Sequence, residues 1–487
     1  MAVQRLPLAF TMGEREPGDT KDALLTNVYQ ETIELSPDGK GGGTEVYVTK
    51  RPGLKSHTDL SAATTDTGRG IYEWQGNIYS VVGDEVFKGT TDLGQINTSS
   101  GIVRFDIAAD GSGLLVFHDG TTFYTINPSN TITERNNGGT SGAVDDEQMP
   151  TNMVPGIVVL DQYAFIMDSD GFIYNSVVGD VTDWPGNNIN AEIRSDSGKA
   201  IARYLNYLVA FGEDTLEFFY DAANASGSPL NRFEGMANLV GCPAGNTVVN
   251  IDQDLVFVAK SPEGGRFVGS LSNGFNTVRI SSNSLDEILD KEGSGIANAY
   301  AYHLRLAGKN LYVLTLPTTA GRTFVADLQE KKWYEWTSDV SDTEGFFQGM
   351  DATELNGDLI LLDDSNGLTY NLDPETYQDQ TGSNETIKVE IRTPKWDGGT
   401  LMNKFMSRLQ ALGDLNSSTG TINIAYSDDD YQTWSTNRTQ DLDNHQSWLT
   451  RLGMFKRRAF RIQHQQNLPM RLSGLEANIE QGHYGRN

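Results

Sequence analysis

The chain has 487 residues, of which 38% are hydrophobic and 9% aromatic, so it can hold one large domain or several of ordinary size. Its net charge of −28 disfavours wrapping around nucleic acid, because that requires clustered Lys and Arg to neutralise phosphates. The single cysteine excludes an internal disulfide, and no stretch approaches the roughly 18 uninterrupted apolar residues of a membrane span.

The first sixty residues predict a β-hairpin. Residues 26–35 and 44–50 alternate apolar and polar side chains, and they flank a Ser-Pro-Asp-Gly turn and a glycine run at 41–43. The apolar patch at 6–10 is too short for the core of a signal peptide, so we expect no export by that route. We interpret residues 1–60 as an N-terminal hairpin segment that could pack on the C-terminal domain.

Residues 61–380 repeat one unit: an apolar or aromatic strand, a tight acidic or glycine-containing turn, and a second strand. The turns centre near residues 83, 119, 170, 213, 264, 320 and 366, on average about 47 residues apart. Asp-Gly and Asn-Gly at several of them supply the positive φ angles of short hairpin turns. A four-stranded propeller blade has a similar length, so the spacing predicts a six- or seven-bladed β-propeller. The alternative is a pair of stacked sandwiches.

Helical patterning is nearly absent, and the best candidate is 284–289. Ser284 and Glu287 have capping-box spacing there, and the apolar residues share one face. After a polar linker at 377–384, residues 381–487 predict a β-sandwich-like assembly domain. Its candidate strands are 387–393, 405–412, 421–426, 459–464 and 472–479. The fold class is therefore all-β.

The charge is unevenly distributed along the chain. Residues 387–487 contain thirteen Lys or Arg and ten Asp or Glu, whereas the first 386 residues contain 24 basic and 55 acidic groups. The sequence therefore indicates two regions with different electrostatic roles. A surface this acidic also keeps a large β protein soluble, and the two readings are compatible.

The many acidic residues suggest a glycosidase, because many propellers are glycosidases that use two carboxylates. Asp168, Asp170, Asp363 and Asp364 all lie at predicted hairpin turns, where hydrogen bonds to the backbone explain them without catalysis. The segment 168–171 also begins like a calcium loop but has Gly179 where the twelfth-position Glu belongs. We expect no catalytic residue, no bound metal and no cofactor. We interpret Cys242 as a small buried hydrophobe.

Residues 427–434 resemble the Asp-box of sialidases and related β proteins, Ser-x-Asp-x-Gly-x-Thr-Trp, with Tyr431 in place of the glycine. In those families the box is a structural hairpin, in which the Asp caps the turn and the Trp packs beneath it. The motif therefore predicts a hairpin in the C-terminal domain and no catalysis.

A basic cluster stands out against the acidic background. It consists of Arg451, Lys456, Arg457, Arg458 and Arg461. One interpretation is an exposed charge run at a strand edge, which protects a β protein from edge pairing. The other is a candidate assembly interface, a docking patch for an acidic partner surface such as another copy of the chain. Both stay open.

Several segments together resemble the tail nozzle family of short-tailed phages, also called packaged-DNA stabilisation or tail hub proteins. They are the run Val-Thr-Lys-Arg-Pro-Gly-Leu at 48–54, the degenerate aromatic blades, residues 278–281 before the helix, and Lys-Trp-Tyr-Glu-Trp at 332–336. The likeness covers most of the chain.

The resemblance implies a structural virion protein without catalysis. Family members look like β-propeller subunits that form a homo-hexameric tube below the portal adaptor, the head-to-tail connector. A tail needle or plug closes the tube, and tailspikes or fibres attach at its side. The tube retains double-stranded DNA and passes it during ejection without specific binding. A tail protein of this kind is assembled in the host cytoplasm. The competing functions are a propeller glycosidase or depolymerase and a carbohydrate-binding propeller.

Overall fold

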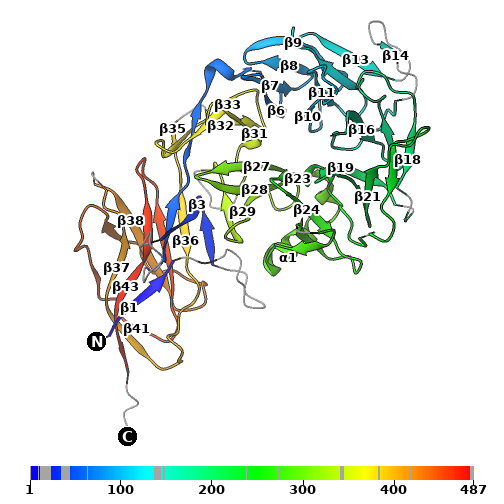
Figure 1. The fold of residues 1–487 in the computed structure, drawn as a ribbon. Helices are drawn as coiled ribbons and strands as arrows, with labels where there is room; N and C mark the ends of the chain where they lie inside the picture. Colours follow the sequence, from blue (N-terminus) through cyan, green and yellow to red (C-terminus); the bar gives the residue numbers. More distant parts are fainter. Residues whose placement is uncertain are drawn as a thin grey trace.

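The predicted hairpins are the central strand pairs of seven blades, each built around four antiparallel strands and arranged in a ring (Figure 1). The computed structural model describes residues 2–8, 10, 23–34, 44–62, 64–136, 144–145, 149–191, 193–194, 196–236, 238–272, 274–339, 345–381, 384–416 and 419–482. The first strands of neighbouring sheets lie side by side around the axis, and β31 (Gly349–Leu355) contacts β6 (Gly68–Trp74), which closes the ring. The propeller prediction is confirmed with seven sheets, and the alternative of stacked sandwiches is wrong.

The first three blades follow directly from the sequence order. Blade one consists of β6, β7 (Asn77–Val82), β8 (Glu85–Lys88) and β9 (Thr91–Gln95). Blade two consists of β10 (Arg104–Ile107), β11 (Leu115–His118), β12 (Phe123–Ile126) and β13 (Ile132–Asn136), with β14 (Val144–Asp145) added in parallel. Blade three consists of β15 (Val158–Leu160), β16 (Tyr163–Met167), β17 (Phe172–Asn175) and β18 (Asn188–Asn190).

The next three blades repeat this order. Blade four consists of β19 (Gly198–Tyr204), β20 (Tyr207–Gly212), β21 (Leu216–Asp221) and β22 (Leu230–Arg232). Blade five consists of β23 (Val249–Ile251), β24 (Asp254–Lys260), β25 (Arg266–Leu271) and β26 (Thr277–Arg279). Blade six consists of β27 (Tyr300–Leu306), β28 (Lys309–Leu316), β29 (Arg322–Asp327) and β30 (Lys332–Trp336).

Blade seven is built from both ends of the propeller sequence. Its strands are β31, β32 (Asp358–Asp363), β33 (Thr369–Asp373) and β5 (Gly53–Ser56). The outermost strand β5 pairs antiparallel with β33, so that Leu54 lies opposite Leu372. Residues 53–56 were predicted to belong to the N-terminal segment, and the structure places them in the propeller instead.

Apolar side chains fill the spaces between neighbouring blades. The central strands, such as β7 and β11, are buried on both faces and so carry almost continuous apolar runs. Between blades one and two the core includes an aromatic group in which the rings of Phe117 and Tyr124 stack with centroids 5.0 Å apart. This packing explains why the repeats share a hydrophobic pattern but no fixed motif.

The helix begins one residue earlier than predicted, and its N-cap lies two residues before Ser284. α1 spans Asn283–Lys291, and its N-cap is Ser282, whose hydroxyl oxygen accepts from the backbone N–H of Leu285. Ser284 therefore lies inside the helix and is not its cap. Short 3-10 turns occur at η1 (Thr58–Leu60), η2 (Gly245–Thr247) and η3 (Gly293–Asn298).

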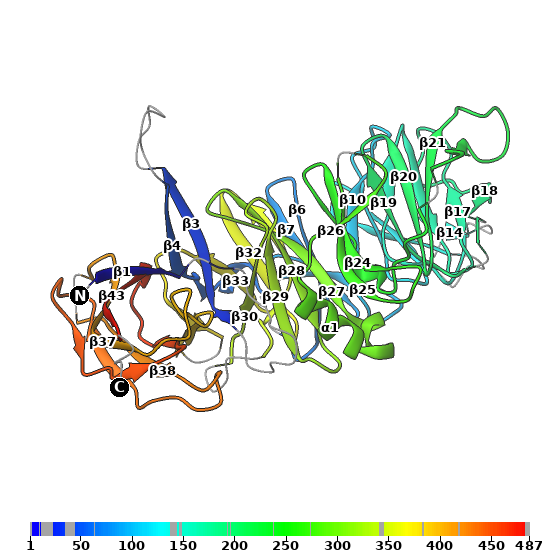
Figure 2. The ribbon, with the colours of Figure 1, turned by 90° about the horizontal axis from the view of Figure 1, so that it is seen from below.

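The two ends of the chain together form a β-sandwich beside the ring, as Figures 1 and 2 show from two directions. One sheet contains β3 (Val28–Glu34), β4 (Thr44–Lys50), β43 (Arg471–Gln481), β37 (Lys404–Gly413) and β40 (Leu449–Thr450), with β1 (Ala2–Pro7) and β41 (Met454–Phe455) at its side. The other contains β2 (Leu24–Thr26), β36 (Val389–Arg392), β42 (Ala459–His464), β38 (Thr421–Ser427) and β39 (Arg438–Asp441).

The second sheet of the sandwich continues into the propeller. Strand β2 pairs antiparallel with β36 on one side and parallel with β30 of blade six on the other, which makes one nine-stranded sheet. The largest hydrophobic core is likewise shared, because it joins residues of blades six and seven to residues of both sandwich sheets. The predicted glycine run at 41–43 and the tip of its hairpin lie outside the described residues.

Candidate functional site at the propeller–sandwich junction

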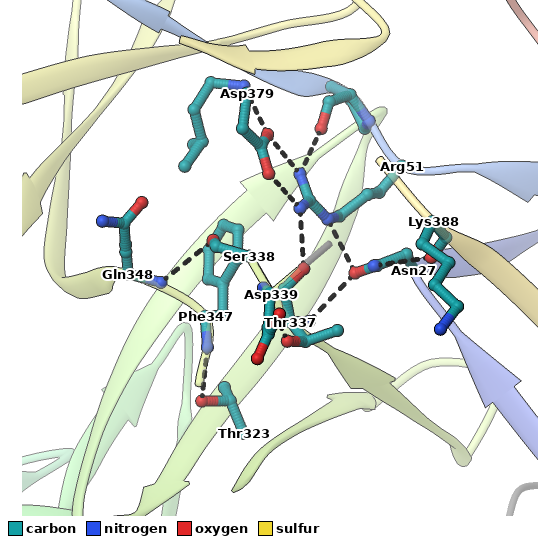
Figure 3. Close-up of polar contacts among 12 residues, drawn as sticks. Asn27, Arg51, Thr323, Thr337, Ser338, Asp339, Phe347, Gln348, Asp379 and Lys388 are labelled. Atoms are coloured by element: carbon teal, nitrogen blue, oxygen red, sulfur yellow. Dashed lines mark hydrogen bonds and ion pairs between the residues drawn. The ribbon is translucent and has the colours of Figure 1, made fainter. Parts of the chain in front are cut away.

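Two of the segments that resemble the phage family, residues 48–54 and 332–336, lie at the junction between the ring and the sandwich. Figure 3 shows the polar contacts around Arg51 at this junction. The chain leaves the sandwich at the end of β4, passes through Arg51 and Pro52, and enters blade seven as β5. The run at 332–336 forms β30, the strand of blade six that borders β2. We call the polar contacts around Arg51 at this crossing the junction cluster.

Arg51 is the centre of the junction cluster. Its side chain is 0% exposed, and its guanidinium makes a bidentate ion pair with Asp379, at 2.9 and 2.6 Å. The remaining N–H groups donate to Asn27 Oδ1 at 2.9 Å and to the carbonyls of Pro52 and Thr337 at 2.9 and 3.0 Å. All five guanidinium donors are therefore used. The guanidinium charge is tolerated in the interior because the group is both paired with a carboxylate and fully hydrogen-bonded.

Asn27 joins the sandwich to blade six through the same cluster. Its Oδ1 also accepts from the backbone N–H of Thr337 at 2.9 Å, and its Nδ2 donates to the carbonyl of Lys388 at 2.9 Å. Its backbone N–H donates to the carbonyl of Glu335 at 2.8 Å. Asn27 has φ of 56°, a conformation that asparagine tolerates better than most residues.

Aromatic residues of β30 pack against the N-terminal hairpin. The indole of Trp336 is fully buried and donates to the carbonyl of Val28 at 3.1 Å. The backbone N–H of Gln30 donates to the hydroxyl of Tyr334 at 3.2 Å. Between these two aromatic residues, the buried carboxylate of Glu335 pairs with Arg322. Blade six is therefore fixed to the sandwich by apolar and polar contacts together.

Two further bases lie buried beside the junction cluster. Lys50 donates from Nζ to the carbonyl of Gln466 at 2.7 Å, and burial together with the neighbouring Arg51 lowers the pKa of Lys50 to about 7. His464 is 1% exposed, and neither ring nitrogen has a hydrogen-bond partner among the described residues. Burial and the nearby Lys50 lower the pKa of His464 to about 3, so its ring is neutral at pH 7.

The predicted basic cluster does not form one surface patch. Arg458 is 1% exposed, pairs with Asp428 through two contacts of 2.7 Å, and lies between the rings of Tyr426 and Phe455. Its charge is satisfied inside the sandwich, so the prediction that Arg458 belongs to a docking surface is wrong.

The other four members of the basic cluster are distributed over the surface. Arg457 pairs with Asp430 at 2.5 Å, and Arg461 stacks over the ring of Trp434 at 5.0 Å. Arg451 and Lys456 are exposed. These two are the members of the cluster that are most accessible to a partner.

The Asp-box keeps its turn although its glycine is replaced. The carboxylate of Asp429 accepts from the backbone N–H of Thr433 at 2.9 Å and from the hydroxyls of Thr433 and Ser427. Hydrogen bonds from Thr433 lower the pKa of Asp429 to about 2. Tyr431 adopts φ of 66°, is buried, and donates from its hydroxyl to the carbonyl of Thr393 at 2.9 Å. The motif is a capped turn, as predicted.

The acidic residues considered for catalysis serve as turn caps in at least two blades. Asp168 Oδ1 accepts from the backbone N–H groups of Asp170 and Phe172, and Asp363 Oδ1 accepts from that of Ser365. Asp168 and Asp170 belong to the turn of blade three, while Asp363 and Asp364 belong to that of blade seven. Within the described ranges no three His, Cys, Asp or Glu side chains are grouped as metal ligands.

Burial raises the pKa of the Cys242 thiol to about 12, which fits a packing role. Among the residues that the structure describes, no helix is long and apolar enough to cross a membrane.

Sequence reasoning missed Asp379 and Asn27. Asp379 lies in β34 (Gln378–Gln380), which pairs with β35 (Asn384–Thr386) in the stretch predicted as a polar linker. The run Arg-Pro-Gly-Leu indicated that Arg51 matters, but nothing near it in sequence identified a partner 328 residues away.

Several solved structures are similar to the chain. Virginiamycin B lyase from Staphylococcus aureus shares 10% identity over 70% of this chain and 98% of that one, with a TM-score of 0.39. The WD40 propeller domain of Doa1 shares 14% identity over 66% of this chain and 96% of that one, with a TM-score of 0.36. The N-terminal domain of Nup159 shares 10% identity over 72% and 98% of the two chains, also with a TM-score of 0.36. No curated protein matches the chain.

A family match is more specific. The sequence model of the Phage_stabilise family, described as bacteriophage P22 Gp10, beta-propeller, matches residues 4–377. That range includes the seven blades up to β33, the N-terminal hairpin and both family-like segments of the junction. The chain therefore belongs to this family of phage tail-associated proteins that stabilise packaged DNA.

Proposed function

We propose that this protein forms the hexameric tail nozzle below the portal adaptor, where it retains packaged DNA and conducts it during ejection. The observation that carries this proposal is the family match over residues 4–377. The proposal goes beyond the family match in its six-fold assembly and in its contacts with the adaptor, a tail needle or plug, and tailspikes or fibres. The role is structural and requires no catalysis.

The charge distribution supports a conduit that does not hold its cargo. The first 386 residues contain 24 basic and 55 acidic groups, so the propeller region is strongly negative. A negative wall repels phosphates at close range, and DNA can pass it without adhering. The negative charge of the propeller region does not prevent subunits from assembling through the sandwich, because the residues from 387 onward are near neutral.

The junction supports a rigid subunit. The continuous nine-stranded sheet and the buried junction cluster join propeller and sandwich through backbone pairing and a satisfied ion pair. A subunit in a tube under load must keep these two parts in a fixed orientation. We therefore propose that the sandwich contributes subunit or adaptor contacts while the propeller forms the wall.

Arg451 and Lys456 are the proposed contact residues on the sandwich. Reversing both to Glu should leave the fold intact, because both side chains are exposed. We expect this double variant to lose assembly with the adaptor, because two positive charges would become negative against an acidic partner surface. Negative-stain microscopy of the protein mixed with portal–adaptor particles should show six-fold nozzles for the wild type and bare adaptors for the variant.

The matched control reverses Lys291 and Lys331, two exposed cations of the propeller. It makes the same change in net charge and should assemble like the wild type. Normal assembly of the Arg451→Glu, Lys456→Glu variant would remove these residues from the interface. An absence of six-fold particles from the wild type with adaptor would contradict the nozzle role itself.

A further inference from the structure

A cavity lies at one end of the propeller axis and has no assigned role. It encloses about 350 Å³ and is lined by residues of blades one, two, five, six and seven. The chain segments around it are the starts of β6, β27 and β31, the approaches to β10 and β23, and the central turns of blades six and seven. A cavity shared by five blades lies at the axis, where the inner strands converge.

The strongest hydrogen-bond donor of the cavity is already used. Arg69 lines it, but its five N–H groups donate to the carbonyls of Gly83, Thr98, Ser100 and Gly101 and to the hydroxyl of Thr98. The guanidinium therefore fixes the loop before β10. No N–H of Arg69 is left to bind an anion in the cavity.

The hydrogen-bond acceptors at and next to the cavity, unlike Arg69, are not all paired. Asn246 lines it, and its buried Oδ1 has no hydrogen-bond partner among the described residues. Asp364 also lines it. Directly before Asp364 in the chain lies Asp363, which is 0% exposed and whose Oδ2 has no partner within the described ranges. Buried acceptors without donors are costly, so the site is suited to a ligand that supplies N–H groups.

The walls of the cavity favour a ligand with an aliphatic stem. Ile102, Pro317 and Met350 line it, and Phe346 lies at its edge with 39% of its surface exposed. Methylene groups pack well on such a surface while a charged end reaches polar groups. The exposed ring of Phe346 can add a cation–π contact.

We propose that this axial cavity binds an alkylammonium or guanidinium group, with its positive end toward Asp364 and Asn246. The group can come from a free polyamine or from a Lys or Arg side chain of a partner chain. The proposal is independent of the nozzle role, because it depends only on the cavity and its unpaired acceptors.

The protonation of Asp364 gives the proposal a pH signature. Burial and the neighbouring Asp363 raise the pKa of Asp364 to about 7, so the free site is largely protonated below pH 6. The other titratable groups at the cavity are Arg69 on β6 and Tyr300 on β27, and burial raises the pKa of Tyr300 further above its usual range. A cation binds the carboxylate form, so its affinity should rise about tenfold from pH 6 to pH 8.

The test is calorimetric titration of the full chain with spermidine, and separately with a short acetylated lysine peptide, at physiological salt. Asp364→Asn should weaken binding at least tenfold and remove the pH dependence. Ala297→Trp should abolish binding by filling the cavity from its rim, where Ala297 is exposed, while leaving every charge in place. Binding of spermidine identifies a free polyamine as a ligand, and binding of the peptide alone identifies a side chain.

The matched control is Asp358→Asn. Asp358 is exposed and begins β32, whereas Asp364 directly follows the other end of that strand, so the control removes the same charge from the opposite face of the blade. It should bind like the wild type. Equal binding by the wild type and Ala297→Trp would show attraction to the acidic surface alone and overturn the proposal. So would an absence of binding by both probes at pH 8.

Discussion

Arg51 connects three parts of the chain that are far apart in sequence. Its guanidinium contacts Asn27 of the sandwich, Thr337 after blade six, and Asp379 after blade seven. A buried ion pair contributes little net stability compared with apolar groups of the same shape, but removal of one partner leaves an uncompensated buried charge. The residue therefore specifies how the parts are arranged, and its loss affects all three contacts.

Arg51→Met should destabilise the protein by roughly 3–5 kcal/mol, because the Asp379 carboxylate would remain buried without its partner. The measurement is urea unfolding followed by tryptophan fluorescence, to which Trp336 beside the cluster contributes. The control is Arg5→Met, which removes a pair with Glu45 in which the arginine side chain is 54% exposed. That variant should hardly change the urea midpoint of unfolding. An equally small effect of Arg51→Met would show that Arg51 is not required to hold the junction together.

At the scale of elements, strand β5 completes blade seven. It begins at Gly53, and a Cβ atom there would lie 2.1 Å from the carbonyl oxygen of Gln378. The backbone of β34 approaches this closely because Asp379 must reach both Arg51 and the backbone N–H of Leu54. The glycine of the Arg-Pro-Gly-Leu run is thus required by the junction.

Gly53→Ala should displace β5 from β33 and destabilise the protein by about 1–3 kcal/mol, as overpacking of a tight contact does. The thermal midpoint and the rate of limited proteolysis near residue 56 measure the effect. Gly265→Ala provides the control, because its Cβ would lie 3.7 Å from the nearest atom, the hydroxyl of Ser261. A Gly53→Ala protein as stable as this control would show that the contact relaxes without cost.

The sequence predicts elements whose signals are local. Turns such as Asp119-Gly120 lie between short apolar runs, and all seven predicted hairpins are present. The completion of blade seven by β5 was not predictable, because the pairing of Leu54 with Leu372 leaves no local pattern. Arg457 and Arg458 are adjacent and of the same residue type, yet only Arg458 is buried. A strand predicted from residue 458 instead of 459 would have placed the side chain of Arg458 on the same face as that of Phe460. Alternation along that strand would then have distinguished Arg458 from Arg457.

At the scale of the whole molecule, propeller and sandwich share one hydrophobic core. That core contains Leu25 and Val48 of the N-terminal segment, Trp336 of blade six, and Ile391 and Leu475 of the sandwich. The sequence suggested three separate ranges, with boundaries at 60 and 380. The structure shows instead that the outer strand of blade six, β30, pairs with β2 from the N-terminal segment, which in turn pairs with β36 of the C-terminal segment.

A chain that ends at residue 386 should therefore fail to give a soluble propeller, since Leu25, Val48 and Trp336 would lose their covering strands. Size-exclusion chromatography after expression is the measurement, with co-expression of residues 387–487 as the control that should restore solubility. A monodisperse, cooperatively melting product from residues 1–386 alone would contradict the shared core.

The pairing of β1 with β43 has a consequence for synthesis on the ribosome. Residues 2–7 are made long before their partner strand at residues 471–481. At roughly 5–20 residues per second, the first strand waits on the order of half a minute or longer. Blades one to six can form as they emerge, because each is made of consecutive strands. The sandwich assembles only after residues 387–481 have been made, so β1 remains without its partner strand until then.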